Sequence, residues 1–198
     1  MNHITVSARS NPEPIFNQYK NAIFAIDQMI GSVLDTLKSC GLLDSTVVVI
    51  TSDHGQEFND LKKNFWEHPS NFSQYQVKVP LVVYHPNQEH RQYHHRTCHV
   101  DVSPTVARRV LGVMNPFADF SVGKDLYDVV DAPFVIAANY TDYALINNKH
   151  IINFQKSGNY QLYDHGMNHI HKSEWNSVDL MSALDMMTVF HHKRGDVN

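Results

Sequence analysis

The sequence has little of what marks several large classes of protein. Among 198 residues there are two cysteines, Cys40 and Cys98, which form neither a C-x-x-C pair nor a disulfide framework. Tracts of lysine and arginine are missing and the formal net charge is −4, which argues against nucleic-acid binding. No run approaches the roughly 18 apolar residues of a membrane span, and residues 1–10 lack the apolar centre of a signal peptide. We therefore expect a soluble chain that binds no nucleic acid.

What the sequence does contain is enough apolar material for one globular domain. Hydrophobic residues make up 42% of the chain. A chain of this length buries most of the apolar surface that it exposes when unfolded. We therefore expect one domain, or a large piece of one, with an α/β portion over residues 1–130 and an antiparallel portion with a final helix over residues 131–198.

The first strong pattern is an amphipathic helix followed at once by a strand. Apolar residues recur at spacings of three and four over residues 16–37, with Pro14 near the start and Gly41 just past the end. Gly31 inside the helix costs about 1 kcal/mol relative to alanine, so we expect it to allow close packing against a neighbouring element. Residues 46–50 are apolar without alternation, which is typical of a strand buried on both faces in a parallel sheet.

The rest of the chain indicates further elements. Residues 56–76 are polar without periodicity and are interpreted as a functional loop or a disordered segment, and a second strand follows over 77–86. Ser103 is predicted to cap a helix with Pro104 at its first position. Four short apolar runs separated by turn residues predict an antiparallel meander over 132–164. In a last helix the expected core contacts are Met181, Leu184, Met187 and Val189.

The predicted first strand runs directly into polar residues, T-S-D-H-G at 51–55. Ligands of open α/β sheets bind at the carboxyl ends of parallel strands, which is the position of Asp53 and His54. A carboxylate oxygen and a neutral imidazole nitrogen are both metal ligands, and Gly55 allows a sharp turn. Alternatively, Asp53 caps a following helix and His54 is a hydrogen-bonded polar residue. The segment alone leaves both interpretations open.

Other polar residues are interpreted mainly as structural or solvated. Glu57 and Asp60 are close enough in sequence to reach a metal bound at His54, but we treat them as loop residues. Asp101 is expected to organise a helix start. The pair His94–His95 is expected to be solvated. Candidates for a basic and aromatic patch near a membrane are Arg91, His94, His95 and Arg96.

Residues 19–55 resemble the sulfatases of the alkaline phosphatase superfamily. The shared pattern is a helix with an aspartate, then I-G, V-L-D-x-L, a glycine, L-x-D-x-T, a hydrophobic strand and S-D-H-G. V-P-L-V-V-Y at 79–84, H-V-D-V-S-P-T-V at 99–106 and G-K-D-L at 123–126 are similar to later segments of the family. Within it, W-E-H-P-S-N-F-S-Q-Y-Q-V-K-V-P and G-N-Y-Q-L-Y are most similar to the periplasmic domain of YejM/PbgA-like inner-membrane proteins.

The resemblance implies a fold and a partial site. The fold is the C-terminal portion of an alkaline phosphatase-like sandwich, an α/β architecture with a parallel or mixed sheet flanked by helices, a small antiparallel meander and a final helix. Asp53 and His54 fall at metal-ligand positions for a divalent ion (Ca, Mg, Mn or Zn), which two protein ligands hold weakly. His68 falls near a histidine that faces the phosphate or sulfate group of the substrate in related transferases.

The resemblance also implies a missing partner. The family nucleophile, a formylglycine or a threonine, and the remaining metal ligands lie in an N-terminal half, and no C-x-P-x-R motif occurs here. We therefore expect part of a metal-dependent hydrolase of sulfuric or phosphoric esters, with no catalytic residue of its own and inactive alone. The alternative is a non-catalytic domain that binds lipid and regulates envelope lipid balance. Either would face the periplasm at the bacterial inner membrane, attached through the parent protein.

Overall fold

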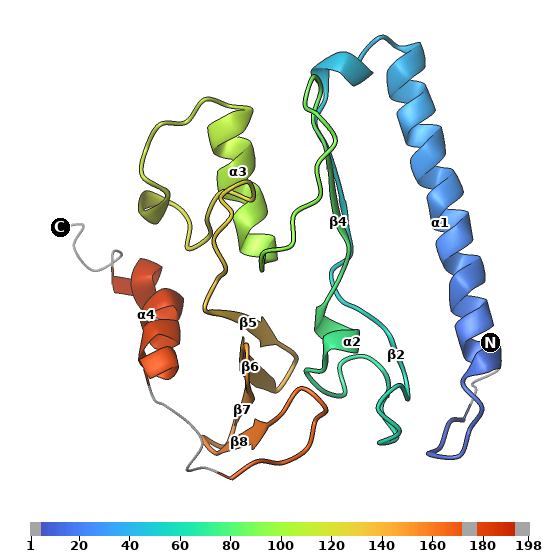
Figure 1. Ribbon diagram of the computed structural model, residues 1–198, viewed down its shortest axis with the longest axis vertical. Coiled ribbons are helices and arrows are strands. Elements are labelled where there is room, and N and C mark those ends of the chain that lie inside the picture. Colours follow the sequence, from blue (N-terminus) through green and yellow to red (C-terminus); the bar gives the residue numbers. More distant parts are fainter. Residues whose placement is uncertain (1–4, 172–177, 193–198) are drawn as a thin grey trace. The chain divides into compact units, whose positions relative to one another are not determined.

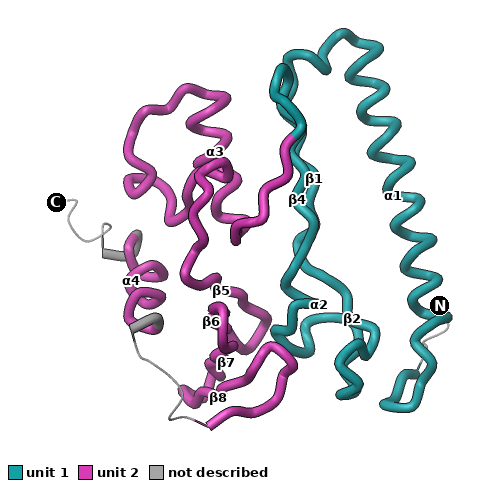
Figure 2. The backbone as a smooth tube through the Cα atoms, in the orientation of Figure 1, with its two compact units in different colours: residues 1–90 teal, residues 91–198 magenta. Residues whose placement is uncertain are grey.

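The chain divides into two compact units, residues 1–90 and residues 91–198 (Figure 2). The computed structural model describes residues 5–171 and 178–192. Within those ranges no helix combines the length and the hydropathy that crossing a membrane requires. The predicted division at residue 130 stays a prediction.

The first unit contains a long helix, a two-stranded sheet and a short hairpin. Its elements are α1 (Glu13–Ser39), the 3-10 turn η1 (Leu43–Ser45), β1 (Val48–Thr51), β2 (Glu57–Phe58), β3 (Trp66–Glu67), α2 (Gln74–Val77) and β4 (Leu81–Tyr84). Figure 1 labels α1, β2, α2 and β4 of this unit. β1 pairs with β4 and β2 pairs with β3, both antiparallel. The segment predicted as a loop therefore contains a hairpin and a turn of helix.

Helix α1 begins and ends as its sequence predicts. Pro14 lies in its first turn, where no backbone N–H is needed. At the other end Gly41 adopts a left-handed φ of 69°, its N–H donates to the Lys38 carbonyl at 3.0 Å, and the Leu42 N–H donates to the Leu37 carbonyl at 2.8 Å. These two hydrogen bonds form a Schellman cap, which requires the conformational freedom of glycine.

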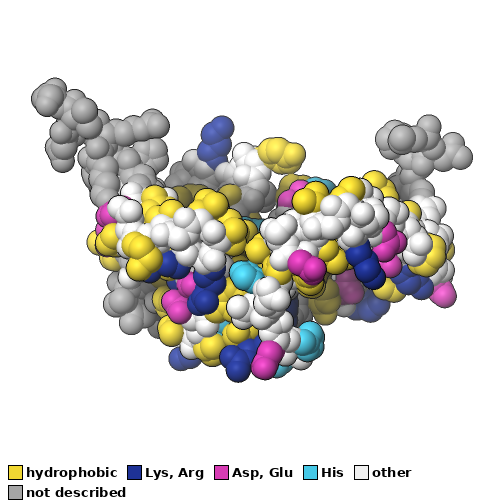
Figure 3. Space-filling model, turned by 90° about the horizontal axis from the view of Figure 1, so that it is seen from above, with side chains coloured by type: hydrophobic (Ala, Val, Ile, Leu, Met, Phe, Trp, Pro, Cys, Tyr) yellow, Lys and Arg dark blue, Asp and Glu magenta, His cyan; other side chains and the backbone are white. Residues whose placement is uncertain are grey.

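The apolar face of α1 is only sparsely covered. No residue of α1 is buried, Met29 is 68% exposed, and hydrophobic side chains lie at the surface of the molecule (Figure 3). Phe16 and Tyr19 contact the ring of Phe58, at centroid distances of 5.1 and 5.2 Å. A Cβ added at Gly31 would meet nothing within 4 Å. The expectation of close packing at Gly31 is therefore not met among the described residues.

The pairing of β1 differs from the sequence expectation in direction and burial. Its neighbour β4 is antiparallel, with Ile50 opposite Val82, and residues 48–50 are half-buried. Among the described residues no parallel strand flanks β1. An apolar run in the sequence indicates that a strand is shielded from solvent, but it does not determine whether the neighbouring strand is parallel or antiparallel. The expected mixture of helices and sheet is nevertheless present.

The second unit is built around the predicted meander. Its elements are η2 (His99–Asp101), α3 (Val102–Arg109), η3 (Phe117–Asp119), β5 (Phe134–Ala138), β6 (Asp142–Asn147), β7 (Ile151–Gln155), β8 (Tyr160–Tyr163) and α4 (Val178–His192). The strands form one antiparallel sheet in the order β5-β6-β7-β8. Its core contains Leu145, Ile152 and Leu162, and Ala183 of α4 packs into it.

The core-facing side of α4 was predicted wrongly. Met181 is 60% exposed, and Leu184 and Met187 are exposed as well, while Val189 is half-buried. The residues that pack on the sheet are Leu180, Ala183 and Met186. Each residue advances a helix by about 100°. Because apolar residues occur on more than one side of α4, a choice displaced by one position selects a different face.

The start of α3 is organised by Asp101 as predicted, but Ser103 is not its cap. Ser103 lies inside α3, because the turn η2 begins the helical segment earlier. Asp101 is buried, and its Oδ2 accepts the backbone N–H of Cys98 at 2.8 Å while its Oδ1 accepts that of Lys124 at 2.9 Å. One carboxylate thus joins the helix start to a distant loop.

Two of the four residues of the predicted basic patch, His95 and Arg96, point into the protein. Arg96 donates to the carbonyls of Ala132 and Pro133 at 3.0 and 3.1 Å. Both ring nitrogens of His95 are buried without a hydrogen-bond partner among the described residues, so the expectation that His95 is solvated was wrong. His94 is exposed, as expected.

Candidate metal and anion site

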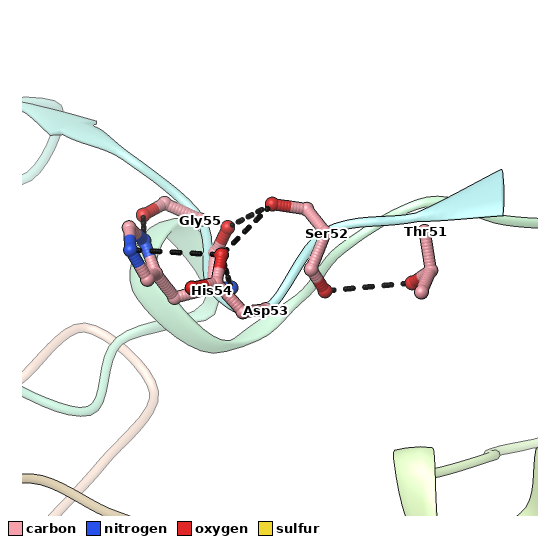
Figure 4. Close-up of polar contacts among 5 residues, drawn as sticks. All are labelled: Thr51, Ser52, Asp53, His54 and Gly55. Carbon is pink, nitrogen blue, oxygen red and sulfur yellow. Dashed lines mark hydrogen bonds and ion pairs between the residues drawn. The ribbon is translucent and has the colours of Figure 1, made fainter.

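The candidate site begins where β1 ends. The Thr51 hydroxyl donates to the Pro80 carbonyl at 2.8 Å, which ties this end of β1 to the chain entering β4. The Ser52 hydroxyl then donates to the His54 carbonyl at 2.8 Å and closes a tight turn (Figure 4). The next element is strand β2, so the alternative in which Asp53 caps a following helix is wrong.

Asp53 and His54 form an adjacent pair at this turn. Their side chains are 86% and 38% exposed, and the Asp53 Oδ1 lies 3.7 Å from the His54 Nε2. The His54 Nδ1 lies 2.8 Å from the Gly55 carbonyl oxygen, which can only accept a hydrogen bond. Nδ1 therefore carries the proton in the neutral ring, and Nε2 keeps a free lone pair.

These atoms fit two positions of a metal coordination shell. Metal–nitrogen and metal–oxygen bonds of about 2.0–2.2 Å allow one ion to reach both atoms across their separation. The carbonyl that fixes the ring through Nδ1 is the usual outer partner of a ligating histidine. Across the described ranges, no group of three or more His, Cys, Asp or Glu side chains is arranged to hold a metal. The pair thus offers two candidate metal ligands.

The surroundings favour the charged form of Asp53. Desolvation raises the pKa of this carboxyl, but the neighbouring His54 and hydrogen bonds from the backbone N–H groups of Asp53 and His54 and from the Ser52 hydroxyl outweigh it. The net effect lowers the pKa of Asp53 below its ordinary value of 3.8. The ionised carboxylate, which is the form that binds metals, is therefore present at neutral pH.

His68 lies against His54 although it comes from a separate loop. It follows β3, and its ring stacks on that of His54 with centroids 3.5 Å apart and planes inclined by 27°. An imidazole nitrogen binds a metal in the plane of its ring. Because the two ring planes are nearly parallel, no single point lies in both planes and within a metal bond length of both rings. A ring nitrogen of His68 is therefore unsuited to share the His54 ion in this arrangement.

Gly55 seats the turn directly on α2. Its N–H donates to the Gln76 carbonyl at 2.8 Å, and an added Cβ would lie 2.2 Å from the Tyr75 carbonyl oxygen. The sequence predicted a glycine needed for a sharp turn. The structure gives a steric reason, because any side chain would collide with the backbone of α2.

Glu57 is the residue whose environment sequence reasoning missed. It was interpreted as a loop residue, yet it lies in β2 and is 0% exposed. Its Oε2 accepts hydrogen bonds from Asn71 Nδ2 at 2.8 Å, Ser73 Oγ at 3.1 Å and Gln76 Nε2 at 2.7 Å. The sequence gives no signal for this cluster, because its members lie in residues 56–76, which show no hydrophobic periodicity. Asp60 is a loop residue, as expected, and accepts the Phe58 N–H at 2.8 Å.

Comparison with known proteins places these observations in a family. The profile of the Sulfatase family matches residues 3–113. The inner membrane protein YejM of Salmonella typhimurium is 31% identical over 159 residues, which cover 79% of this chain and 26% of that protein. Steryl-sulfatase of Rattus norvegicus is 30% identical over 140 residues, which cover 63% of this chain and 24% of that protein. The chain thus spans about a quarter of the length of these relatives.

The fold is shared with a solved structure. That of the phosphonate monoester hydrolase of Agrobacterium radiobacter is 18% identical and matches with a TM-score of 0.59, over 84% of this chain and 39% of that chain. The architecture predicted from the sequence motifs is therefore confirmed. With the match to the family profile over more than half of its residues, the chain belongs to the sulfatase family.

Proposed function

We propose that this chain contributes part of the divalent-metal and anion site of a sulfatase-family protein that hydrolyses or transfers sulfuric or phosphoric esters. One observation carries the proposal. The free Nε2 of His54 and the carboxylate of Asp53 lie 3.7 Å apart in an exposed turn, with His68 stacked beside them. The side chains of Asp53 and His54 are accessible to solvent, so a ligand can reach them.

Each residue of the pair has a defined role in this proposal. Asp53 and His54 hold the ion, and the Gly55 carbonyl keeps the His54 ring in the orientation and tautomer that present Nε2. His68 donates a ring N–H to an oxygen of the bound anion. A divalent ion at this position supplies Lewis-acid stabilisation of the charge that develops on the ester oxygens.

The remaining parts of the site are proposed to come from an N-terminal half of the same polypeptide. The relatives are about four times as long as the matched segment, which supports this partner. We assign the nucleophile and the other metal ligands to it. With two ligands the chain alone holds Ca, Mg, Mn or Zn weakly, and it does not hydrolyse esters.

The likeness to YejM supports a location and a second candidate function. YejM of Salmonella typhimurium is an inner membrane protein, so we place the parent of this chain at the bacterial inner membrane, with this domain on the periplasmic side. The second candidate is a non-catalytic domain that binds lipid and regulates envelope lipid balance. The lipid-binding candidate depends on the predicted basic patch, but Arg96 is hydrogen-bonded to backbone carbonyls and the ring nitrogens of His95 are buried. The side chains of Asp53 and His54, by contrast, are accessible to solvent. The metal site is therefore our first choice.

Paramagnetic Mn²⁺ tests the proposal, because it broadens NMR signals near even a weakly bound ion. We expect the imidazole signals of His54 and His68 to broaden first as Mn²⁺ is added to the full chain. Asp53→Asn and His54→Ala should abolish this selectivity. His85→Ala is the matched control, because the His85 Nδ1 also lies near the next carbonyl, that of Pro86, at 3.1 Å. Equal broadening of His85 and His54 would contradict the proposed site.

A further inference from the structure

We propose that Glu57 is a positioning residue that holds His68 against His54. Its buried carboxyl group fastens the segment carrying His68 and, through Gln76, the turn carrying His54. The value of this arrangement to a reaction rests on the proposed function. The arrangement itself is a property of the described residues, so the two can be tested separately.

Glu57 contacts the His68 segment on both sides of that histidine. On the N-terminal side, Glu57 in β2 is paired with Glu67 in β3, which directly precedes His68. On the C-terminal side, the Glu57 Oε2 accepts hydrogen bonds from the Asn71 Nδ2 at 2.8 Å and the Ser73 Oγ at 3.1 Å. The few residues between Glu67 and Asn71 are therefore held at both ends by one residue, which limits where the His68 ring can lie.

Gln76 connects this segment to the turn at the end of β1. Its side chain donates to the Glu57 Oε2 at 2.7 Å and to the Ser70 hydroxyl at 2.8 Å. Its carbonyl accepts the Gly55 N–H at 2.8 Å. Gln76 is thus hydrogen-bonded both to the turn that carries His54 and to the loop that carries His68. Glu57 holds the Gln76 side chain in place.

Within the described part of the chain, the carboxyl group of Glu57 has one well-paired oxygen and one unpaired oxygen. Glu57 is fully buried, and its second oxygen, Oε1, has no hydrogen-bond partner among the described residues. A buried polar atom without a partner is costly, and this cost is set against the three donors that Oε2 pairs, those of Asn71, Ser73 and Gln76. Buried unpaired atoms of this kind call for a specific explanation. The need for one acceptor shared by several donors around the histidine pair provides it.

The test uses the mutual ring-current shift of the two imidazoles, observed by NMR on the isotope-labelled full chain. His68→Ala gives the His54 signal without stacking. We expect Glu57→Ala to move the His54 ring protons most of the way to that value. Glu57→Gln should retain most of the shift, because its amide oxygen can accept the same donors with its nitrogen at the unpartnered position. The matched control is Glu67→Ala, which removes an exposed carboxylate from the paired strand and should leave the shift unchanged.

A folded Glu57→Ala variant with an unchanged His54 shift would overturn the proposal, as would a Glu67→Ala variant with the same effect as Glu57→Ala. If Glu57→Ala does not fold, Ser73→Ala serves instead, because it removes a single donor to the Glu57 carboxyl group. We expect it to reduce the ring-current shift of His54 partially, and an unchanged shift would contradict the proposal. Mn²⁺ titration of the same samples separates this inference from the proposed function. Loss of stacking in Glu57→Ala with no Mn²⁺ binding in the unmodified chain would support positioning and refute the metal site.

Discussion

At the scale of single residues, the end of β1 shows how neighbouring groups assign chemistry to ordinary side chains. The Gly55 carbonyl selects the tautomer of His54, and His54 with nearby donors favours the carboxylate of Asp53. Both effects are local and need only the backbone path of the turn. They leave the carboxylate of Asp53 and the Nε2 of His54 as the two candidate ligands of the proposed ion.

The lowered pKa of Asp53 predicts a specific pH dependence. A carboxyl whose pKa is lower in the folded state contributes stability above its unfolded pKa, and this contribution is lost as the pH falls through the folded value. For Asp53 the loss therefore occurs below about pH 3.8, its ordinary pKa. Carboxyl ¹³C NMR titration should give an apparent pKa under 3.8 in the unmodified chain and a higher one in His54→Ala. Equal values in both would show that His54 does not stabilise the charge.

A pair of glycine substitutions tests the steric fit of the turn. Gly55→Ala should destabilise the chain by about 1–3 kcal/mol, because its Cβ would lie 2.2 Å from a backbone oxygen of α2. Gly31→Ala is the control, since a Cβ there meets nothing within 4 Å, and should stabilise α1 by about 0.5–1 kcal/mol. Urea unfolding measures both. A neutral Gly55→Ala would show that the turn is not seated on α2.

At the scale of elements, helix starts and strand ends are set by contacts between distant segments. The start of α3 depends on a carboxylate that also accepts an N–H from the loop at Lys124. β1 is joined to the chain entering β4 by the Thr51 hydroxyl. Such contacts explain why the presence of an element was easier to predict than its cap or its partner.

Asp101 gives the test at this scale. Asp101→Ala removes the buried acceptor of two part-buried backbone N–H groups, those of Cys98 and Lys124. We expect a loss of about 2–4 kcal/mol in the free energy of unfolding. Asp128→Ala, at an exposed position, should change it by less than about 0.5 kcal/mol. Chemical unfolding followed by circular dichroism compares the two. Similar losses in both variants would contradict the assigned role of Asp101.

At the scale of the whole molecule, the partial site sets a limit on activity. The chain spans about a quarter of its curated relatives and presents two adjacent candidate ligands in an exposed turn. We expect no turnover of an aryl sulfate or an aryl phosphate by the purified chain at saturating Mn²⁺ or Ca²⁺. A steady-state assay with a chromogenic ester measures it. Clear turnover that is abolished by Asp53→Ala and retained in His85→Ala would prove this expectation wrong.

The sequence by itself determined the family, the long helix α1 with its glycine cap, the strands of the meander and the Asp53–His54 pair. These depend on local periodicity, turn residues and contiguous motifs, all of which lie within short stretches of chain. The tertiary structure decided the direction of the β1 neighbour, the core face of α4, the stacking of His68 on His54 and the burial of Glu57. These depend on which distant segments meet, and hydrogen bonds between segments leave no periodic trace in the sequence.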